Sequence, residues 1–377
     1  MSHAWIDGRP VALHVATAEA ARLLAASRVP VVAGLGTDIA GARAAIALAE
    51  RIGASIDHMN SETVLRDVEV MRAAGIMLTT PNEARLRADV LLMIGAGLVE
   101  AWPELPERLL MRPPMAQVDA ITAQRRILWL CPGGDPTKLA GRAKVHVVGR
   151  NRKDLPVLLA ALRARLAGRP VGKTLLAAKA LDAFAAELRA ARFGVAVWSA
   201  AELDTLTIEM LCGMVADLNA TTRFTGLALA AADNALGVLQ ACGWMTGFPM
   251  RTSFGRGFPE HDTWRFDAAR LVESGEADCA VWISAYRAAA PAWKRQVPVI
   301  ALTGQDARFR QKPRVHINVG QPGTDHDAVE HDAATGTLVP AVAKDPSKAV
   351  SVAAALAQIA AVLPSPGAWP LRSPRGS

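Results

Sequence analysis

The chain has 377 residues, of which 51% are hydrophobic and 20% are charged, and its formal net charge is +7. This composition excludes a disordered chain and supplies enough apolar surface for a large core, and the length favours two domains. The apolar runs are shorter than the roughly 20 residues that cross a bilayer. No basic segment followed by an apolar run opens the sequence, so we expect a cytoplasmic protein without membrane contact.

The positive charge has two interpretations, solubility and attraction to a polyanion. Basic residues are scattered and no nucleic-acid-binding motif occurs, so no nucleic-acid partner is expected. The four cysteines form no Cys-x-x-Cys pair and have no histidine at metal-ligand spacing. Each is expected to pack as a small buried hydrophobic residue; they are Cys131, Cys212, Cys242 and Cys279.

Short apolar segments recur along the chain and are typical of strands buried on both faces of a sheet. They are Val29–Leu35, Val90–Ile94, Ile127–Leu130, Val145–Val148, Val195–Trp198, Gly226–Leu229, Cys279–Ile283, Val297–Leu302 and Val315–Val319. Helical patterns lie between them, at Ile39–Ile52, Leu155–Leu166, Leu175–Ala191, Thr205–Leu218 and Val350–Leu363. The alternation predicts α/β domains with largely parallel sheets.

The chain is internally repeated. Ala88–Ala96 resembles Ala277–Ala285, and each is followed by a strand with a polar turn and then by a strand containing a Val-His pair. A strand followed by a helix precedes each unit, at 29–52 and 193–218. Two units of one α/β plan therefore fit the chain, and the repeat alone suggests a boundary near residue 170.

Motifs for known chemistries mostly fail. Gly34–Asp38 lies between a strand and a helix, where phosphate loops occur, but Ile39 replaces the third glycine of a dinucleotide loop and Ala42 the lysine of a Walker A loop. We interpret it as a tight strand–helix turn, with an anion site as the alternative. Neighbouring His and Asp residues are interpreted as surface groups, although His326 and His331 could converge on a metal. No catalytic residue is predicted.

Three spaced motifs are unusual: Asn234-x-x-Gly237-x-x-Gln240, Trp244–Pro249 and Ser253–Pro259. They closely resemble the B subunit of formylmethanofuran dehydrogenase, which holds a tungsto- or molybdopterin. The resemblance covers roughly residues 29–338 and includes segments 47–57 and 87–95. It implies an α/β fold of two Rossmann-like, largely parallel-sheet domains of the molybdopterin oxidoreductase type, lacking the N-terminal iron–sulfur domain.

The departures from that family concern its redox site. No cysteine precedes Cys131, although the family begins with a cysteine cluster for iron and sulfur, and His58–Thr63 stands where the family places a metal-coordinating cysteine. Ala230–Asp233 replaces an Arg-Gly-His motif. We therefore expect no molybdenum, tungsten or iron–sulfur cluster and no metal in this chain. The degenerate cleft is expected near Asn60, Ser61, Glu62, Gly95, Gly247 and Gly255.

This combination resembles the B subunit of the bacterial formyltransferase/hydrolase complex of methylotrophs. The resemblance implies a non-catalytic structural subunit in formaldehyde oxidation, in a complex that converts formyl-tetrahydromethanopterin to formate through a methanofuran-type carrier. It implies as partners a zinc amidohydrolase-like A subunit, the C subunit and the formyltransferase D subunit, with zinc and the carrier bound elsewhere in the complex. The carrier's polyglutamate tail is a candidate ligand for basic side chains: Arg85, Arg87, Arg251, Arg256 and Arg265.

Two other functions stay open. An active molybdo- or tungstopterin oxidoreductase subunit acting on formylmethanofuran would need an oxygen ligand from Asp57, Ser61 or Glu62. An independent nucleotide-binding enzyme is disfavoured because both phosphate-loop motifs fail. For the domains, the family architecture implies an inserted α/β domain at 60–170, within a discontinuous α/β domain of 10–59 and 171–362. Residues 363–377 are expected to form an extended or disordered arm.

Overall fold

The computed structural model describes residues 4–110, 125–136, 144–172, 176–304 and 306–364. Contacts within the chain divide it into two compact units. Unit 1 comprises Met1–Glu62, Ala232–His331 and Leu338–Ser377, and unit 2 comprises Thr63–Ala231 and Asp332–Thr337. The chain therefore leaves unit 1 after its first strands and returns to it at Ala232.

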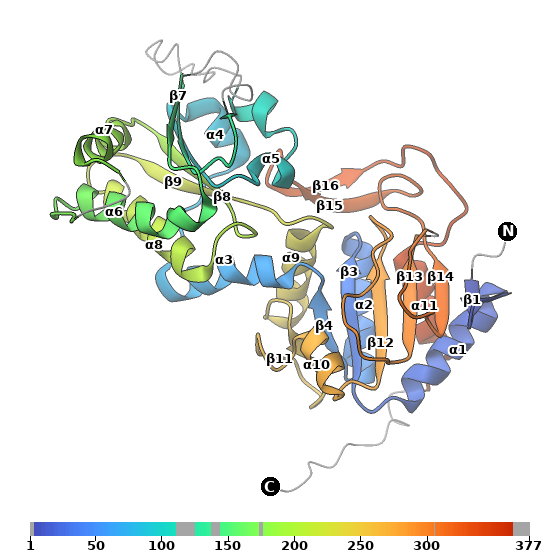
Figure 1. Ribbon diagram of the computed structural model, residues 1–377. Coiled ribbons are helices and arrows are strands. Elements are labelled where there is room, and N and C mark those ends of the chain that lie inside the picture. Colours follow the sequence, from blue (N-terminus) through green and yellow to red (C-terminus); the bar gives the residue numbers. More distant parts are fainter. Residues whose placement is uncertain (1–3, 111–124, 137–143, 173–175, 305, 365–377) are drawn as a thin grey trace, which may run out of the picture. The chain divides into compact units, whose positions relative to one another are not determined.

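A nine-stranded sheet forms the centre of unit 1, as far as the structure describes it. Its strands are β1 (Ala4–Ile6), β2 (Arg9–Val11), β3 (Pro30–Gly36), β4 (Ser55–His58), β10 (Thr252–Ser253), β11 (Glu260–His261), β12 (Cys279–Ser284), β13 (Val299–Thr303) and β14 (Val315–Asn318). Their order is β11-β10-β4-β3-β12-β13-β14-β1-β2 (Figure 1). The central strands from β4 to β14 are parallel, and the short strands at both edges are antiparallel.

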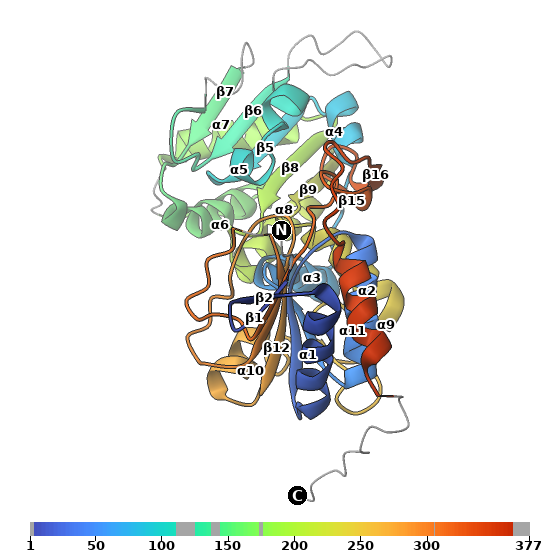
Figure 2. The same cartoon turned by 90° about the vertical axis from the view of Figure 1, so that its right-hand side faces the viewer.

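Helices cover both faces of this sheet. They are α1 (Leu13–Ala26), α2 (Ile39–Ile52), α9 (Ala235–Thr246), α10 (Ala268–Ser274) and α11 (Val352–Val362). The helices α1, α11, α2 and α9 pack in that sequence on one face, and α10 packs against β3 and β4 on the other (Figure 2). This layering buries the central strands on both sides.

Unit 2 contains a five-stranded parallel sheet in its described part, in the order β7-β6-β5-β8-β9. The strands are β5 (Val90–Ile94), β6 (Arg126–Leu130), β7 (Lys144–Val148), β8 (Gly194–Ser199) and β9 (Phe224–Leu229). The helical segments are α3 (Ser61–Ala74), α4 (Pro81–Arg87), α5 (Leu98–Ala101), η1 (Pro106–Leu110), η3 (Arg152–Asp154), α6 (Leu155–Leu166), α7 (Ala178–Arg189) and α8 (Thr205–Leu218). A separate two-stranded sheet is formed by β15 (Ala328–Asp332) and β16 (Thr337–Ala341).

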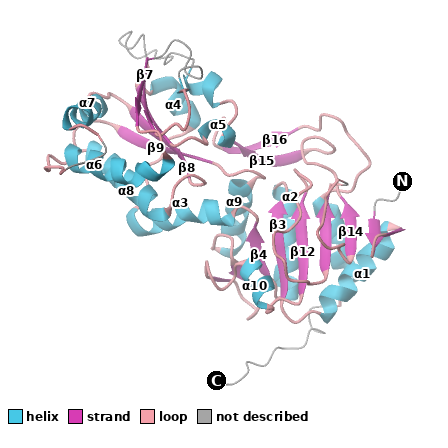
Figure 3. Cartoon of the chain, in the orientation of Figure 1, coloured by secondary structure: helices cyan, strands magenta, loops and turns pink. Residues whose placement is uncertain are grey.

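The strand sequences are uninterrupted apolar runs because both faces of each sheet are covered. Figure 3 shows how helices and strands alternate along the chain. In β5, Leu92 and Ile94 belong to one hydrophobic cluster, whereas Leu91 and Met93 belong to another. A strand with two buried faces loses the alternation of polar and apolar residues. The prediction of an α/β fold with largely parallel sheets is therefore confirmed.

Helix boundaries follow from local capping. The carboxylate of Asp38 accepts the Gly41 amide N–H at 3.0 Å and so caps α2, and Gly53 ends the helix in the left-handed conformation at φ 65°. β3 ends at Gly36 and α2 begins at Ile39, so Thr37 and Asp38 form the tight strand–helix turn that was predicted for Gly34–Asp38. Among the described residues, no helix is both long and apolar enough to cross a membrane.

The internal repeat appears as one strand order in both units. In unit 1 the central order is β4-β3-β12-β13-β14, and in unit 2 it is β9-β8-β5-β6-β7. Each sheet combines a strand–helix–strand segment from one repeat with three strands from the other. The repeats therefore exchange halves, and neither unit is one continuous repeat.

This exchange explains where the domain boundaries differ from the expected ones. The insertion was expected at 60–170, but β8 and β9 pair within the sheet of β5, so the segment up to Ala231 belongs to unit 2. The insertion starts at Thr63, three residues after the expected start at residue 60. The expected C-terminal arm falls, from residue 365 on, outside the described residues.

An aspartate joins the two halves of each sheet at equivalent positions; Asp89 is buried and Asp278 is exposed. The Asp278 carboxylate, just before β12, accepts the amide N–H groups of Arg28 at 2.7 Å and Val29 at 3.0 Å, just before β3. The Asp89 carboxylate, just before β5, accepts those of Arg192 at 3.1 Å and Phe193 at 2.8 Å, just before β8. We call these contacts the aspartate clamps; they set the register between strands that are far apart in sequence.

Replacing Asp89 by alanine is expected to lower the free energy of unfolding by about 2–4 kcal/mol, because two backbone donors lose a charged acceptor in a buried place. Denaturant unfolding of the purified protein measures this loss. The control is Asp217→Ala, which removes a carboxylate from a partly exposed pair with Arg163 and should cost less than about 1 kcal/mol. Equal costs for the two variants would contradict the role of the clamp.

Candidate functional site

The carboxyl ends of β3, β4 and β12 lie where the chain order of the unit 1 sheet reverses. From β3 the chain runs to β4 on one side, whereas β12 pairs with β3 on the other side. Loops leaving such a point diverge and create a crevice, which is the usual ligand site of open α/β sheets. Gly34 has φ +84°, and a Cβ there would lie 2.4 Å from the Ile283 carbonyl oxygen, so glycine allows β3 and β12 to approach.

The segment after β4 is held by a network of hydrogen bonds. His58 Nε2 lies 3.0 Å from the Asp233 carbonyl oxygen, and His58 Nδ1 accepts the Asn60 amide N–H at 2.9 Å. Because Nδ1 accepts a hydrogen bond, Nε2 carries the ring proton and donates a hydrogen bond to the Asp233 carbonyl oxygen. Burial lowers the pKa of His58 to about 4, so the ring is neutral at physiological pH.

Asn60 completes this network from its side chain. Its Nδ2 donates to the Ala232 carbonyl oxygen at 2.9 Å and to the Asp233 carboxylate at 3.1 Å. The same carboxylate pairs with Arg287 at 2.6 Å. Thus His58–Thr63, which the resemblance aligned with a metal-coordinating segment, begins with side chains that bind the chain's own backbone and carboxylates.

The Asn-x-x-Gly motif has a structural cause. Asn234 adopts a left-handed conformation at φ 58°, and its side chain donates to the Thr37 carbonyl oxygen and accepts the His331 amide N–H, both at 2.9 Å. A Cβ at Gly237 would lie 2.2 Å from Asn234 Oδ1. Glycine three residues later is therefore required for the asparagine to join these two segments.

Arg251 forms a second polar centre. Its guanidinium lies 2.6 Å from the Asp267 carboxylate, 3.3 Å from Glu62 and 3.6 Å from Asp57, and its Nη1 donates to the Thr263 carbonyl oxygen at 2.7 Å. Its side chain is only 12% exposed. The prediction of Arg251 as a contact for a carrier tail missed these internal partners, of which Asp57 and Glu62 lie far from it in sequence.

The other residues predicted for the degenerate cleft have local backbone roles. Ser61 is buried and accepts the His58 amide N–H at 3.0 Å. Gly247 ends α9 in the left-handed conformation, and the Gly255 amide N–H donates to the Ser253 hydroxyl. Gly95 belongs to unit 2, where it follows β5 at φ 89°. Of the six residues predicted for the cleft, Asn60, Ser61 and Glu62 are consecutive in sequence. Gly95, Gly247 and Gly255 each belong to a separate turn.

The remaining arginines differ in exposure and partners. Arg256 is 69% exposed, pairs with Glu260 at 3.0 Å and lies over the Phe258 ring. Arg265 is exposed and lies over the Phe266 ring. In unit 2, Arg87 pairs with Glu83 at 2.6 Å, and Arg85 lines a hollow with Glu104, Glu107 and Arg108.

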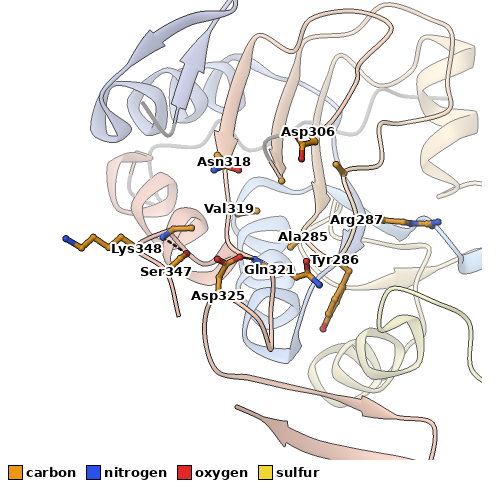
Figure 4. A pocket seen from close by; sticks show the side chains of 13 residues that line it. Ala285, Tyr286, Arg287, Asp306, Asn318, Val319, Gln321, Asp325, Ser347 and Lys348 are labelled. Carbon is orange, nitrogen blue, oxygen red and sulfur yellow. Dashed lines mark hydrogen bonds between the residues drawn. The ribbon is translucent and has the colours of Figure 1, made fainter. Parts of the chain in front are cut away.

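Sequence reasoning missed a cavity of about 400 Å³ at the carboxyl ends of β12, β13 and β14 (Figure 4). Gln321 and Asp325 lie side by side in it, and the backbone N–H of Gln321 donates to the Asp325 carboxylate at 2.7 Å. On another side of the cavity, the Tyr286 hydroxyl donates to Glu330 at 2.7 Å, and burial raises the pKa of this phenol. The signal available in the sequence was the polar turn that follows each of these strands.

The four cysteines are free and buried, as predicted. Burial raises the pKa of Cys131 and Cys242 to about 11 and that of Cys212 and Cys279 to about 12, so all four are neutral thiols at physiological pH. Within the ranges that the structure covers, no group of three or more His, Cys, Asp or Glu side chains could hold a metal ion.

Comparison with known proteins shows the family. No protein-family model matches the chain. The B subunit of the formyltransferase/hydrolase complex of Methylorubrum extorquens is 36% identical over 348 residues, which are 92% of each chain. This chain belongs to the family of that B subunit. The predicted resemblance is therefore confirmed.

A solved structure supports the same family. The crystal structure of the formyltransferase/hydrolase complex FhcABCD from Methylorubrum extorquens, in complex with methylofuran, contains a chain that superposes on this one with a TM-score of 0.84. The two chains share 36% identity, and the match covers 94% of this chain and 97% of the other. This chain thus shares its fold with a chain of that complex.

The redox enzymes are more distant relatives. The B subunit of the tungsten-containing formylmethanofuran dehydrogenase 2 is 27% identical over 280 residues in Methanocaldococcus jannaschii and 24% identical over 283 residues in Methanococcus maripaludis. The match covers 72% and 73% of this chain and 64% of each dehydrogenase protein. The B subunit of the formyltransferase/hydrolase complex is therefore the more similar relative in both identity and coverage.

His58→Gln tests the buried network of this B-subunit family member. Because the folded state keeps His58 neutral down to a pKa of about 4, the unfolded chain binds a proton first as the pH falls below 6.5. The wild type should lose about 2–3 kcal/mol of folding stability relative to the variant between pH 7 and 4.5. Denaturant unfolding across this range measures the difference.

The control is Leu24→Ala, which truncates a buried side chain and removes no titratable group. It should lower the stability by a similar amount at every pH, so its curve should run parallel to that of the wild type. If the stability curves of His58→Gln and the wild type run parallel from pH 7 to 4.5, His58 is not held neutral by the fold.

Proposed function

We propose that this chain is a non-catalytic structural subunit of a formyltransferase/hydrolase complex, which converts formyl-tetrahydromethanopterin to formate through a methanofuran-type carrier. The observation that carries the proposal is the 36% identity over 92% of the chain to the B subunit of such a complex. Its partners are a zinc amidohydrolase-like A subunit, the C subunit and the formyltransferase D subunit. Zinc and the reacting end of the carrier belong to those partners.

The geometry after β4 supports a subunit without a redox centre. Of the three residues with an oxygen that could replace the missing thiolate, Ser61 is 1% exposed and already accepts the His58 amide N–H. Asp57 accepts the Ala268 amide N–H at 3.0 Å, and Glu62 pairs with Arg251. An active pterin oxidoreductase would have to break these internal contacts, so we consider it the less supported function.

An exposed aromatic surface supports the role in assembly. It lies in unit 1, on the segment from the end of α9 to the start of α10, and includes Trp244 at 70% and Trp264 at 69% exposure. The members of this aromatic surface are Trp244, Met245, Phe248, Phe258 and Trp264. Large exposed apolar patches mark interfaces, and tryptophan and arginine are enriched at their energetic centres. We assign this surface to contact with another member of the complex.

Basic side chains flank the aromatic surface and are candidates for the carrier's polyglutamate tail. Arg256 lies over Phe258, and Arg265 is exposed next to Trp264. We propose these two as the main tail contacts among the five arginines considered. Arg251 contributes less because three carboxylates surround it, and Arg85 and Arg87 are proposed as secondary contacts in unit 2.

Two double variants test assembly and carrier binding in one experiment. The chain is expressed with its partner subunits and purified by a tag, and the recovered subunits and carrier are quantified. Trp244→Ser with Trp264→Ser should reduce the recovered subunits about tenfold, because it removes the apolar anchors. Arg256→Glu with Arg265→Glu should retain the subunits and lose most of the carrier, because it reverses the charge facing the tail.

Leu206→Ser and Arg43→Glu are the controls, since Leu206 is 67% exposed in unit 2 and Arg43 is an exposed residue of α2. Neither should change the recovery of subunits or carrier. Full recovery of subunits with the tryptophan variant would contradict the assembly surface. Unchanged carrier content with the arginine variant would contradict the tail contacts.

A further inference from the structure

Four arginines that are far apart in the sequence gather where the strands of unit 2 begin. Arg126 is the first residue of β6, Arg223 directly precedes β9, Arg189 is the last residue of α7, and Arg169 follows the end of α6. Parallel strands start at one edge of their sheet, and the helices that connect them return to that edge. All described strands of the unit 2 sheet are parallel, so the four arginines share this edge. We call their surface the basic edge.

Hydrogen bonds join the segments of the basic edge to one another. Arg189 Nη2 donates to the carbonyl oxygen of Leu166, the last residue of α6, at 2.8 Å. Arg126 Nη2 donates at 3.1 Å to the carbonyl oxygen of the residue after Arg189. The Gly194 amide N–H donates to the Arg223 carbonyl oxygen at 2.8 Å. The basic edge is therefore one surface, which runs from β9 across β8 and β5 to β6, about 14 Å at the usual strand spacing.

Three of these arginines carry a positive charge that no carboxylate in the described part of the chain compensates. Arg169, Arg189 and Arg223 are exposed, and none of them forms an ion pair with a described residue. Arg126 lies 3.5 Å from the Asp89 carboxylate. The nearby carboxylates of Asp182 and Asp217 already pair with Arg165 at 2.9 Å and Arg163 at 2.8 Å, respectively. The basic edge thus has a local surplus of positive charge.

The chemistry of the basic edge favours the carboxylates of another protein over nucleic acid. Its four guanidinium groups can each bind a carboxylate through two parallel hydrogen bonds, and arginine is enriched at protein interfaces, where lysine is depleted. Phe193, which precedes β8 at this edge, is only 6% exposed, and Arg87 lies over its ring at 4.6 Å. The ring is therefore not available for stacking with a nucleic-acid base.

We propose that the basic edge docks an acidic face of a partner protein, which forms ion pairs with Arg169, Arg189 and Arg223. The inference rests on the proposed membership of a complex, but it concerns a second surface, in the unit that does not carry the aromatic surface. The two contacts differ in chemistry. Salt screens ion pairs at an exposed interface, whereas it does not weaken apolar contacts, so the acidic partner is the one that salt should release.

Purification of the co-expressed complex at two salt concentrations tests the proposal. The tagged chain is recovered in about 0.1 M and about 1 M KCl, where the screening length is about 10 Å and about 3 Å. Subunits, carrier and nucleic acid are quantified. The wild type should keep every subunit at the lower concentration and lose one of them at the higher. Arg169→Glu with Arg223→Glu should lose the same subunit about tenfold at the lower concentration, because it places like charges against the acidic face.

This pair is chosen because neither side chain makes a contact with another described residue, so the fold should be retained. The matched control is Arg9→Glu with Arg43→Glu, which makes the same charge change at two exposed arginines of unit 1. It should behave as the wild type at both salt concentrations. Arg169→Gln with Arg223→Gln removes the charges without reversing them and should lose an intermediate amount of the same subunit.

Recovery of every subunit by the Arg169→Glu, Arg223→Glu variant at both salt concentrations would overturn the proposal. A loss of nucleic acid or carrier with all subunits retained would also overturn it, because the basic edge would then bind that polyanion. Either result leaves the proposed function standing, since the aromatic surface does not depend on these charges. If the wild type recovers no partner subunit at all, the proposed function fails and this inference fails with it.

Discussion

The aspartate clamps are the interactions on which the two sheets depend. Each carboxylate binds two backbone N–H groups at the start of the neighbouring strand, Asp278 at β3 and Asp89 at β8. In each unit the two repeats meet at this point: β3 pairs with β12 in unit 1, and β8 pairs with β5 in unit 2. The clamps therefore fix the register between strands that no short turn connects, where a parallel pair would otherwise be free to slip.

The exchange of halves between the repeats also determines where the polar networks lie. The chain leaves unit 1 shortly after β4 and returns to it at Ala232, so both crossing segments are near the carboxyl ends of the unit 1 strands. His58 and Asn60 on one segment bind Ala232 and Asp233 on the other. In this chain these contacts join the two crossing segments.

Much of the fold could be predicted from the sequence because its central strands are buried on both faces. The limits of α2, α6 and α8 were predicted to the residue. For α2 and α8, an aspartate cap accepts an amide N–H, from Asp38 and Asp204. The helix α1 was not predicted, since Ala12 at its start makes no side-chain cap. The helix α9 was missed for a related reason, because the Asn234 side chain binds Thr37 and His331 instead of capping the helix.

The candidate site could be predicted only in part. The segment Asn60–Glu62 was identified because a resemblance located it. The contacts of Arg251 with Glu62 and of Asp57 with Ala268 join segments 189 and 211 residues apart and follow no local pattern. The exchange of halves likewise leaves no local signal, since each strand has the same apolar composition whichever sheet it joins. Long-range pairing of this kind has to be seen in the fold.

The central proposal is that this family member, a distant relative of tungsten-containing B subunits, has internal hydrogen bonds in place of a redox site. The most direct measurement is elemental and pterin analysis of the complex purified with this chain from its native source. The account predicts molybdenum, tungsten and pterin far below one per chain. Stoichiometric molybdenum or tungsten retained by this chain would contradict it.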